Sequence, residues 1–157
     1  MANNPNITII PLFYFLAVVS CIALTTANRT TNEFFLKVHI VYILNDMDDD
    51  SKPLIARCKS GDDDFGEKLL KKGESFYWRF KLHLFGRTLY FCRLRWEKEK
   101  NRSFDVFEDG RETRICNING GEGDYYWKAN REGIYFSCDG KKFHKRCEWD
   151  QKIKCTD

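Results

Sequence analysis

The most informative stretch of the sequence runs from Arg57 to Trp96 and reads RCKSGDDDFGEKLLKKGESFYWRFKLHLFGRTLYFCRLRW. Between residues 76 and 84 the even positions are all apolar, while the odd positions are mostly polar or charged. The alternation resumes between residues 88 and 96, after the interruption Phe85-Gly86-Arg87. A period of two is typical of strands that bury one face. We therefore predict two half-buried strands that form a hairpin around a short glycine-containing loop.

Short strands are also predicted on both sides of this hairpin. Their ranges are 36–44, 54–59, 103–108, 125–130, 133–138 and 143–149. Residues 67–72 are expected to form a loop or an edge strand. In the strand at 36–44, Val38, Ile40 and Tyr42 are expected to share one face. Turn signals separate the strands and no long amphipathic helix is evident. The fold class predicted is all-β, an antiparallel β-sandwich of about eight strands, immunoglobulin-like in architecture and disulfide-bonded.

The N-terminal segment differs sharply in composition from the rest of the chain. Residues 1–28 contain no Lys, Arg, Asp or Glu, although charged residues make up 31% of the sequence. The apolar run 9–24 is followed by the small residues Thr25, Thr26 and Ala27, which is the layout of a secretory signal peptide. A membrane anchor is the alternative, but the run is short for a bilayer span and contains Pro11. We predict a signal peptide at 1–27, removal of that segment, a single secreted domain at 28–157 and no stable membrane insertion.

The cysteines support an extracellular location. Cys21 belongs to the predicted leader, which leaves an even number in the mature chain, namely Cys58, Cys92, Cys116, Cys138, Cys147 and Cys155. An even set in an exported chain predicts disulfides, and the absence of a Cys-x-x-Cys spacing excludes zinc-ribbon and thioredoxin-type sites. Fifteen connectivities are possible for six cysteines, and all remain open at this point.

The net charge indicates whether the chain binds nucleic acid, and the sequons indicate where it could carry glycans. The formal net charge is only +3, so we expect no nucleic-acid binding, which would require a concentrated basic surface. Asn101 and Asn28 each begin an Asn-x-Ser/Thr sequon in the mature chain and are the N-glycosylation candidates. Asn101, expected just before a strand, is the better placed of the two.

The acidic residues and the histidines are the candidates for a metal or catalytic site. The acidic residues at 46–50 and 62–64 could supply oxygen ligands for calcium, but neither run has the order of an EF-hand loop. Asp62 to Asp64 are expected instead to accept hydrogen bonds from backbone amides before Phe65. The histidines His39, His83 and His144 are expected on the polar faces of strands. We therefore predict no enzyme, no cofactor and no metal.

Several ordered motifs resemble the plant self-incompatibility S-protein family, also called S-protein homologues. They are Cys58-Lys59-Ser60, Asp62-Asp63-Asp64-Phe65-Gly66, Phe76-Tyr77-Trp78-Arg79-Phe80, Phe85-Gly86-x-Thr88-Leu89-x-Phe91-Cys92, Trp96, Phe104-Asp105-Val106, Trp127-Lys128, Gly133-Ile134-Tyr135 and Glu148-Trp149. The resemblance implies a small, secreted, disulfide-bonded β-sandwich of plants. The best-understood members act as pistil-secreted ligands that a pollen plasma-membrane protein recognises.

The expected function is that of a secreted extracellular ligand that a plasma-membrane receptor protein recognises. We expect the ligand to be a monomer. The alternative is a cell-wall or membrane-active defence protein that binds carbohydrate or lipid. Arg57 stands where the family more often has histidine, which we interpret as a surface substitution. Because loops on a rigid scaffold can vary at little cost to the core, we expect partner contacts at 45–53, 109–124 and 139–142.

Overall fold

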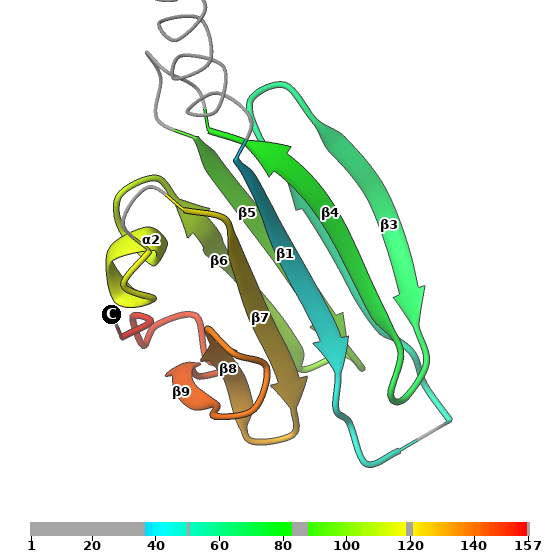
Figure 1. Cartoon of the computed structure of the whole chain (residues 1–157). Helices are drawn as coiled ribbons and strands as arrows, with labels where there is room; N and C mark the ends of the chain where they lie inside the picture. The colour runs from blue at the N-terminus through cyan, green and yellow to red at the C-terminus, as the bar shows by residue number, and fades with distance from the viewer. Residues whose placement is uncertain (1–36, 50, 83–87, 119–120, 157) are drawn as a thin grey trace, which may run out of the picture. The chain divides into compact units, whose positions relative to one another are not determined.

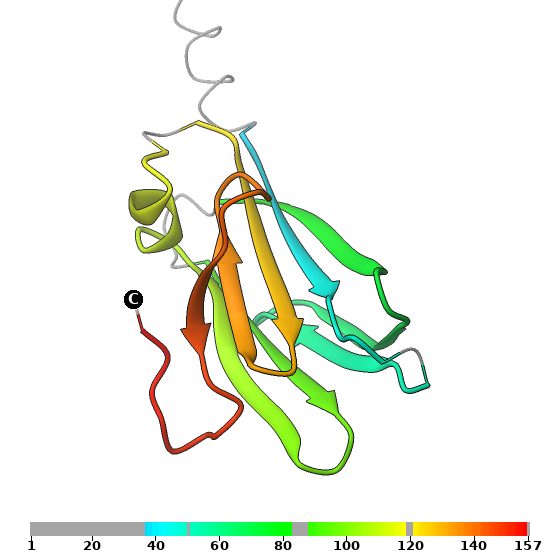
Figure 2. The ribbon, with the colours of Figure 1, turned by 90° about the horizontal axis from the view of Figure 1, so that it is seen from below.

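Two sheets form the part of the chain that the computed structural model describes, namely residues 37–49, 51–82, 88–118 and 121–156 (Figure 1). The five-stranded sheet has the order β4 (Ser75–Lys81), β1 (Val38–Asn45), β7 (Gly123–Asn130), β8 (Gly133–Ser137) and β9 (His144–Cys147). The four-stranded sheet has the order β3 (Asp64–Leu70), β2 (Leu54–Lys59), β5 (Leu89–Trp96) and β6 (Lys100–Glu108). A single helical turn, α2 (Glu112–Ile115), lies between β6 and β7. The two sheets face each other (Figure 2), so the all-β sandwich prediction is confirmed.

The inner faces of the sheets pack through aromatic side chains. Phe80 of β4 lies 4.7 Å, between ring centroids, from both Tyr90 of β5 and Phe107 of β6. Phe107 in turn contacts Tyr125 of β7 at 5.0 Å. Burial of each such side chain contributes about 1.5–3 kcal/mol. These contacts join strands of opposite sheets, so they fix how the sheets stack.

The predicted core face of residues 76–96 is confirmed, but the predicted hairpin is wrong. Trp78 and Phe80 are buried, as are Cys92 and Leu94. However, β4 pairs with β1, whereas β5 pairs with β2 and β6 in the other sheet. Alternation determines which face of a strand is buried, but it says nothing about which strand lies beside it. Residues 83–87, which include the loop predicted at Phe85-Gly86-Arg87, lie outside the described residues.

The architecture differs from the expectation in two further respects. There are nine described strands rather than about eight, because residues 67–70 of the segment expected to be a loop or an edge strand belong to the edge strand β3. The pairing of β1 with β7 is parallel, while every other described pair is antiparallel. A parallel pair forms between segments far apart in the sequence, so no local turn signal announces it.

The inner face of β1 carries a histidine, which corrects the expected surface position of His39. His39 is only 1% exposed, and its Nδ1 lies 3.0 Å from the hydroxyl of Tyr125. Val38, Ile40 and Tyr42 do share a face, but it is the outer one. Both faces of this strand are largely apolar, so alternation alone could not assign the core side. His144 is exposed, as expected, and His83 lies outside the described residues.

Three disulfides confirm the predicted disulfide-bonded character. Cys58–Cys92 joins directly opposed residues of β2 and β5. Cys116–Cys138 joins the segment after α2 to the end of β8. Cys147–Cys155 ties the C-terminal tail to β9. The predicted signal peptide at 1–27 lies outside the described residues and stays a prediction.

Candidate functional site

The three loops predicted for partner binding lie at two ends of the sandwich. The 109–124 loop leads into β7, and the 139–142 loop follows β8, which is antiparallel to β7. These two loops therefore lie at one end of the sandwich (Figure 2). The Cys116–Cys138 disulfide joins the first loop to the residue that precedes the second. The 45–53 loop follows β1 and lies at the opposite end (Figure 1). The three loops cannot form a single contact surface.

We call residues 109–118 and 138–143 the tied loop end. A buried carboxylate anchors its first segment, because the side chain of Glu112 in α2 is only 1% exposed. Its Oε2 accepts a hydrogen bond from the backbone N–H of Glu108 at 2.6 Å, and its Oε1 accepts one from Arg111 Nε at 2.7 Å. Burial raises the pKa of Glu112, although these donors oppose the shift. No pattern in the sequence indicated that this glutamate faces inward.

An aspartate organises the second segment of the tied loop end. Asp139 Oδ1 accepts hydrogen bonds from the backbone N–H groups of Lys141 and Lys142, each at 2.8 Å, and from the hydroxyl of Ser137 at 2.8 Å. These donors, led by the backbone N–H of Lys142, lower the pKa of Asp139 to about 2. The turn predicted at Asp139-Gly140 is thus held in one conformation by local hydrogen bonds.

The exposed side chains of the tied loop end are basic and apolar. Ile115 is 41% exposed, and Arg114, Lys141 and Lys142 are also exposed. Among the described residues, none of these three cations takes part in an ion pair. An ordered backbone therefore presents side chains that are available to a partner.

A row of tyrosines crosses the outer face of the five-stranded sheet next to this end. Tyr42 of β1 is directly opposite Tyr77 of β4 and Tyr126 of β7. Its ring centroid lies 5.5 Å from that of Tyr77 and 4.6 Å from that of Tyr126. Gly140 has a φ of +68°, and a Cβ placed there would lie 3.3 Å from the Tyr126 ring. The 139–142 turn is therefore seated on this row.

The opposite end carries the acidic residues considered for calcium, and their carboxylates contact basic side chains. The ion pairs of this end are Asp46–Lys128, Asp48–Arg131 and Lys52–Glu97. Asp49 accepts a hydrogen bond from the backbone N–H of Ser51. Within residues 37–49, 51–82, 88–118 and 121–156, no three His, Cys, Asp or Glu side chains are grouped to hold a metal ion.

The second acidic run makes the local contacts that were expected at one of its three positions. Asp64 Oδ1 accepts a hydrogen bond from the backbone N–H of Gly66 at 3.0 Å. Asp63 instead accepts one from the Tyr90 hydroxyl at 2.9 Å. Arg57 is exposed and its Nη2 lies 2.8 Å from Asp64 Oδ2, which lowers the pKa of that carboxyl. Arg57 is thus a surface residue, as interpreted from the sequence.

The glycosylation candidate Asn101 lies within β6 rather than before a strand. It is half-buried, and its Oδ1 accepts a hydrogen bond from Arg93 Nε at 2.9 Å. Because it is opposite Arg95 on an edge strand, a glycan there would extend over the outer face of the four-stranded sheet. Asn28 lies outside the described residues.

Fold and disulfides together define a small, disulfide-bonded β-sandwich. The profile of the family described as plant self-incompatibility protein S1 matches residues 40–149. The chain belongs to this family. Neither the family nor the relatives below are named for an enzymatic activity.

Two curated relatives illustrate the similarity. S-protein homolog 2 of Arabidopsis thaliana is 36% identical over 128 residues, which cover 80% of this chain and 77% of the relative. S-protein homolog 6 of the same plant is 32% identical over 126 residues, covering 79% of this chain and 86% of the relative.

A solved structure shares the fold. It is a self-incompatibility protein homologue from a family described as small, highly stable, secreted plant proteins. The TM-score is 0.54 at 18% identity, over 73% of this chain and 96% of the other. In the part of this chain that is described, no helix is long and apolar enough to cross a membrane.

Proposed function

We propose that this chain is a secreted extracellular ligand that a plasma-membrane protein recognises through the tied loop end. The observation that carries the proposal is that the backbone of the tied loop end is held in place while side chains at its tip are exposed. Glu112 and the Cys116–Cys138 bridge hold the backbone, while Ile115 and the neighbouring cations extend outwards. A preorganised loop loses little conformational entropy on binding, so its contacts translate more fully into affinity.

The opposite end is less suited to this role. Its charged side chains already form ion pairs such as Lys52–Glu97 at 3.2 Å and Asp46–Lys128 at 3.2 Å. A partner would have to displace or desolvate these pairs, which offsets part of the gain from new contacts. At the tied loop end Arg114, Lys141 and Lys142 make no such pairs among the described residues, so these three cations can attract an acidic partner surface.

The test is binding of the labelled, purified protein to intact plant cells. Saturable binding that protease treatment of the cells removes would support a protein partner. Ile115→Glu combined with Lys142→Glu should abolish it. The matched control is Leu69→Glu combined with Lys98→Glu, because Leu69 is 64% exposed on β3 and Lys98 is exposed at the other end. Equal loss of binding in both double variants would contradict the proposal.

A second candidate, binding to cell-wall carbohydrate or to lipid, is favoured by the tyrosine row. Tyr77 is 52% exposed, and aromatic faces are common contacts for sugars and interfacial lipids. Pull-down with purified polysaccharide and with liposomes distinguishes the two. Retention on either one that Tyr77→Ala removes, without protease-sensitive binding to cells, would favour the second candidate. Expression in the stigma would add support for a role in self-incompatibility.

A further inference from the structure

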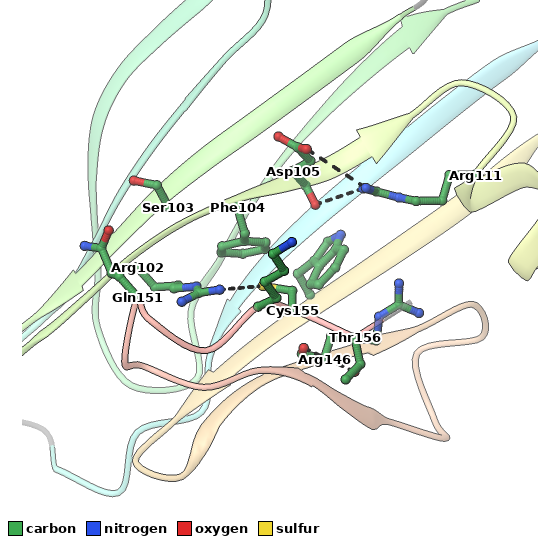
Figure 3. A pocket seen from close by; sticks show the side chains of 11 residues that line it. Arg102, Ser103, Phe104, Asp105, Arg111, Arg146, Gln151, Cys155 and Thr156 are labelled. Atoms are coloured by element: carbon green, nitrogen blue, oxygen red, sulfur yellow. Dashed lines mark hydrogen bonds and ion pairs between the residues drawn. The ribbon is translucent and has the colours of Figure 1, made fainter.

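A cavity of about 290 Å³ lies where the C-terminal tail crosses between edge strand β6 and edge strand β9 (Figure 3). The tail is held on both sides. Gln151 Nε2 donates a hydrogen bond to the backbone oxygen of Asn101 in β6 at 3.0 Å. The backbone N–H of Thr156 donates one to the backbone oxygen of Arg146 in β9 at 2.7 Å. We call this cavity the seam pocket; its lining includes Arg102, Asp105, Arg111, Trp127, Arg146 and Lys154.

The most unusual group in the seam pocket is the guanidinium of Arg102. This residue of β6 is only 5% exposed. Its Nη1 donates to the backbone oxygen of Asp150 at 2.5 Å, and its Nη2 lies 3.1 Å from Cys155 Sγ. Its Nε is buried and has no hydrogen-bond acceptor in the described part of the chain. Neither the carbonyl nor the sulfur carries a full negative charge.

The nearby carboxylates are engaged elsewhere. Asp150 accepts a hydrogen bond from the backbone N–H of Lys152 through its own carboxylate, at 2.9 Å. Asp105 lies 4.0 Å from Arg111 Nη1 (Figure 3). Among the described residues, none supplies Arg102 with an ion pair. A buried cation without a counter-charge is costly, so its surroundings favour an anion.

Further positive groups surround the same space. Arg146 lines the pocket from β9, and Lys154 lines it from the tail, where its side chain makes no ion pair with described residues. Arg111 also lines the pocket, but Glu112 and Glu108 already offset its charge. Arginine presents a planar fork of N–H donors that matches the oxygens of carboxylate, phosphate and sulfate groups.

We propose that the seam pocket binds a small oxyanion, a carboxylate, phosphate or sulfate group, between Arg102 and Lys154. The volume is at the lower limit of ligand pockets, which begin at roughly 300 Å³, so the ligand is no larger than a single acidic sugar. Trp127 also lines the pocket, and its indole N–H donates to the backbone oxygen of Val106 at 2.8 Å. This site is separate from the exposed tip of the tied loop end, so it does not depend on the proposed cell-surface partner.

The test titrates the purified full-length secreted protein with inorganic phosphate, sulfate and galacturonate, with glucose as the neutral control. Calorimetry gives the affinity, and NMR follows the Nε–H of Arg102 and the indole N–H of Trp127. Saturable binding of at least one anion in the millimolar range or tighter is expected, with a shift of the Arg102 signal. The anion that binds most tightly shows whether the pocket prefers a phosphate, a sulfate or a carboxylate group.

Two variants of the C-terminal tail distinguish binding in the seam pocket from general electrostatic attraction to the protein surface. Lys154→Glu should weaken binding roughly tenfold or more, because it places a negative charge against the ligand. Lys152→Glu makes the same charge change on an exposed tail residue that does not line the pocket, so it should leave the affinity within about twofold. Equal weakening by both variants, binding of glucose with equal affinity, or no saturable binding of any of the three anions would overturn the proposal.

Discussion

Replacement of Glu112 tests whether a buried carboxylate holds the tied loop end. In Glu112→Ala the backbone N–H of Glu108 loses its acceptor at 2.6 Å, and Arg111 loses its contact at 2.7 Å. A hydrogen bond to a charged group contributes about 1.5–3 kcal/mol. Arg111 is 23% exposed and keeps Glu108, so part of its loss is recovered through water and that neighbour. We expect a decrease of about 3 kcal/mol in the free energy of unfolding.

Glu112→Gln separates the charge from the shape of this side chain. The amide oxygen can replace one of the two acceptor contacts, so the expected loss is about 1–2 kcal/mol. The pH dependence should change as well. Burial raises the pKa of Glu112 above its ordinary value of 4.5, so the folded state binds the proton more readily than the unfolded state. The contribution of this proton binding to the free energy of unfolding is complete below pH 4.5 and is lost as the pH rises through the pKa of Glu112 in the folded state.

The assay is urea unfolding at neutral and at acidic pH, with hydrogen exchange of residues 108–118 as a local readout. Acidification should favour the wild type relative to Glu112→Gln. The control is Glu99→Ala, at an exposed position in the turn between β5 and β6. A loss of less than about 1 kcal/mol in Glu112→Ala, or parallel pH profiles of wild type and Glu112→Gln, would contradict an anchoring role of Glu112.

Four further changes have distinct expected outcomes. Burial lowers the pKa of His39 in the folded state. The contribution of His39 to the free energy of unfolding is therefore complete above pH 6.5 and is lost as the pH falls towards the folded pKa. His39→Phe should flatten this part of a curve of stability against pH. Replacing both Cys116 and Cys138 by serine should cost about 3 kcal/mol in urea unfolding, because the bridge closes a loop with a sequence separation of 22. Gly140→Ala should cost about 1–2 kcal/mol, since φ is +68° and the new Cβ would meet an aromatic ring, and a melting temperature equal to wild type would contradict this. Asn101→Gln should abolish a glycosidase-induced mobility shift of the secreted protein, and the absence of a shift in wild type would count against a glycan there.

Much of the sandwich could be predicted because local alternation reports burial directly. Trp78 and Phe80 in β4, and Cys92 and Leu94 in β5, all face the core as their parity indicates. Which strands pair with each other could not be predicted in the same way. The strands flanking residues 83–87 join different sheets, and β1 pairs with a strand more than 80 residues later, as in Val41 opposite Tyr125. Such pairings depend on the whole core.

The candidate sites were predicted less completely, for reasons visible at particular residues. Arg102 could have been found, because extending the alternation of Phe104 and Val106 by one step places it on the inner face of β6. Its basic side chain argued for the surface, and the tail that covers it follows almost 50 residues later. Glu112 had no such signal, because a glutamate in a turn-rich segment is normally exposed. Buried charged groups are determined by tertiary contacts, which local patterns do not encode.

Arg111 connects the two candidate sites, and this makes their tests mutually informative. Its guanidinium contacts Glu112 at the base of the tied loop end and also lines the seam pocket. Removing the Glu112 carboxylate therefore loosens the loop while leaving Arg111 with less negative charge around it. A loop-dependent partner should then bind more weakly, but a small oxyanion should bind at least as well. Lys154→Glu should have the reverse pattern, because the tail residue affects the pocket and not the loop. Opposite responses of the two ligands would separate two sites, whereas parallel losses would indicate that both variants merely destabilise one fold.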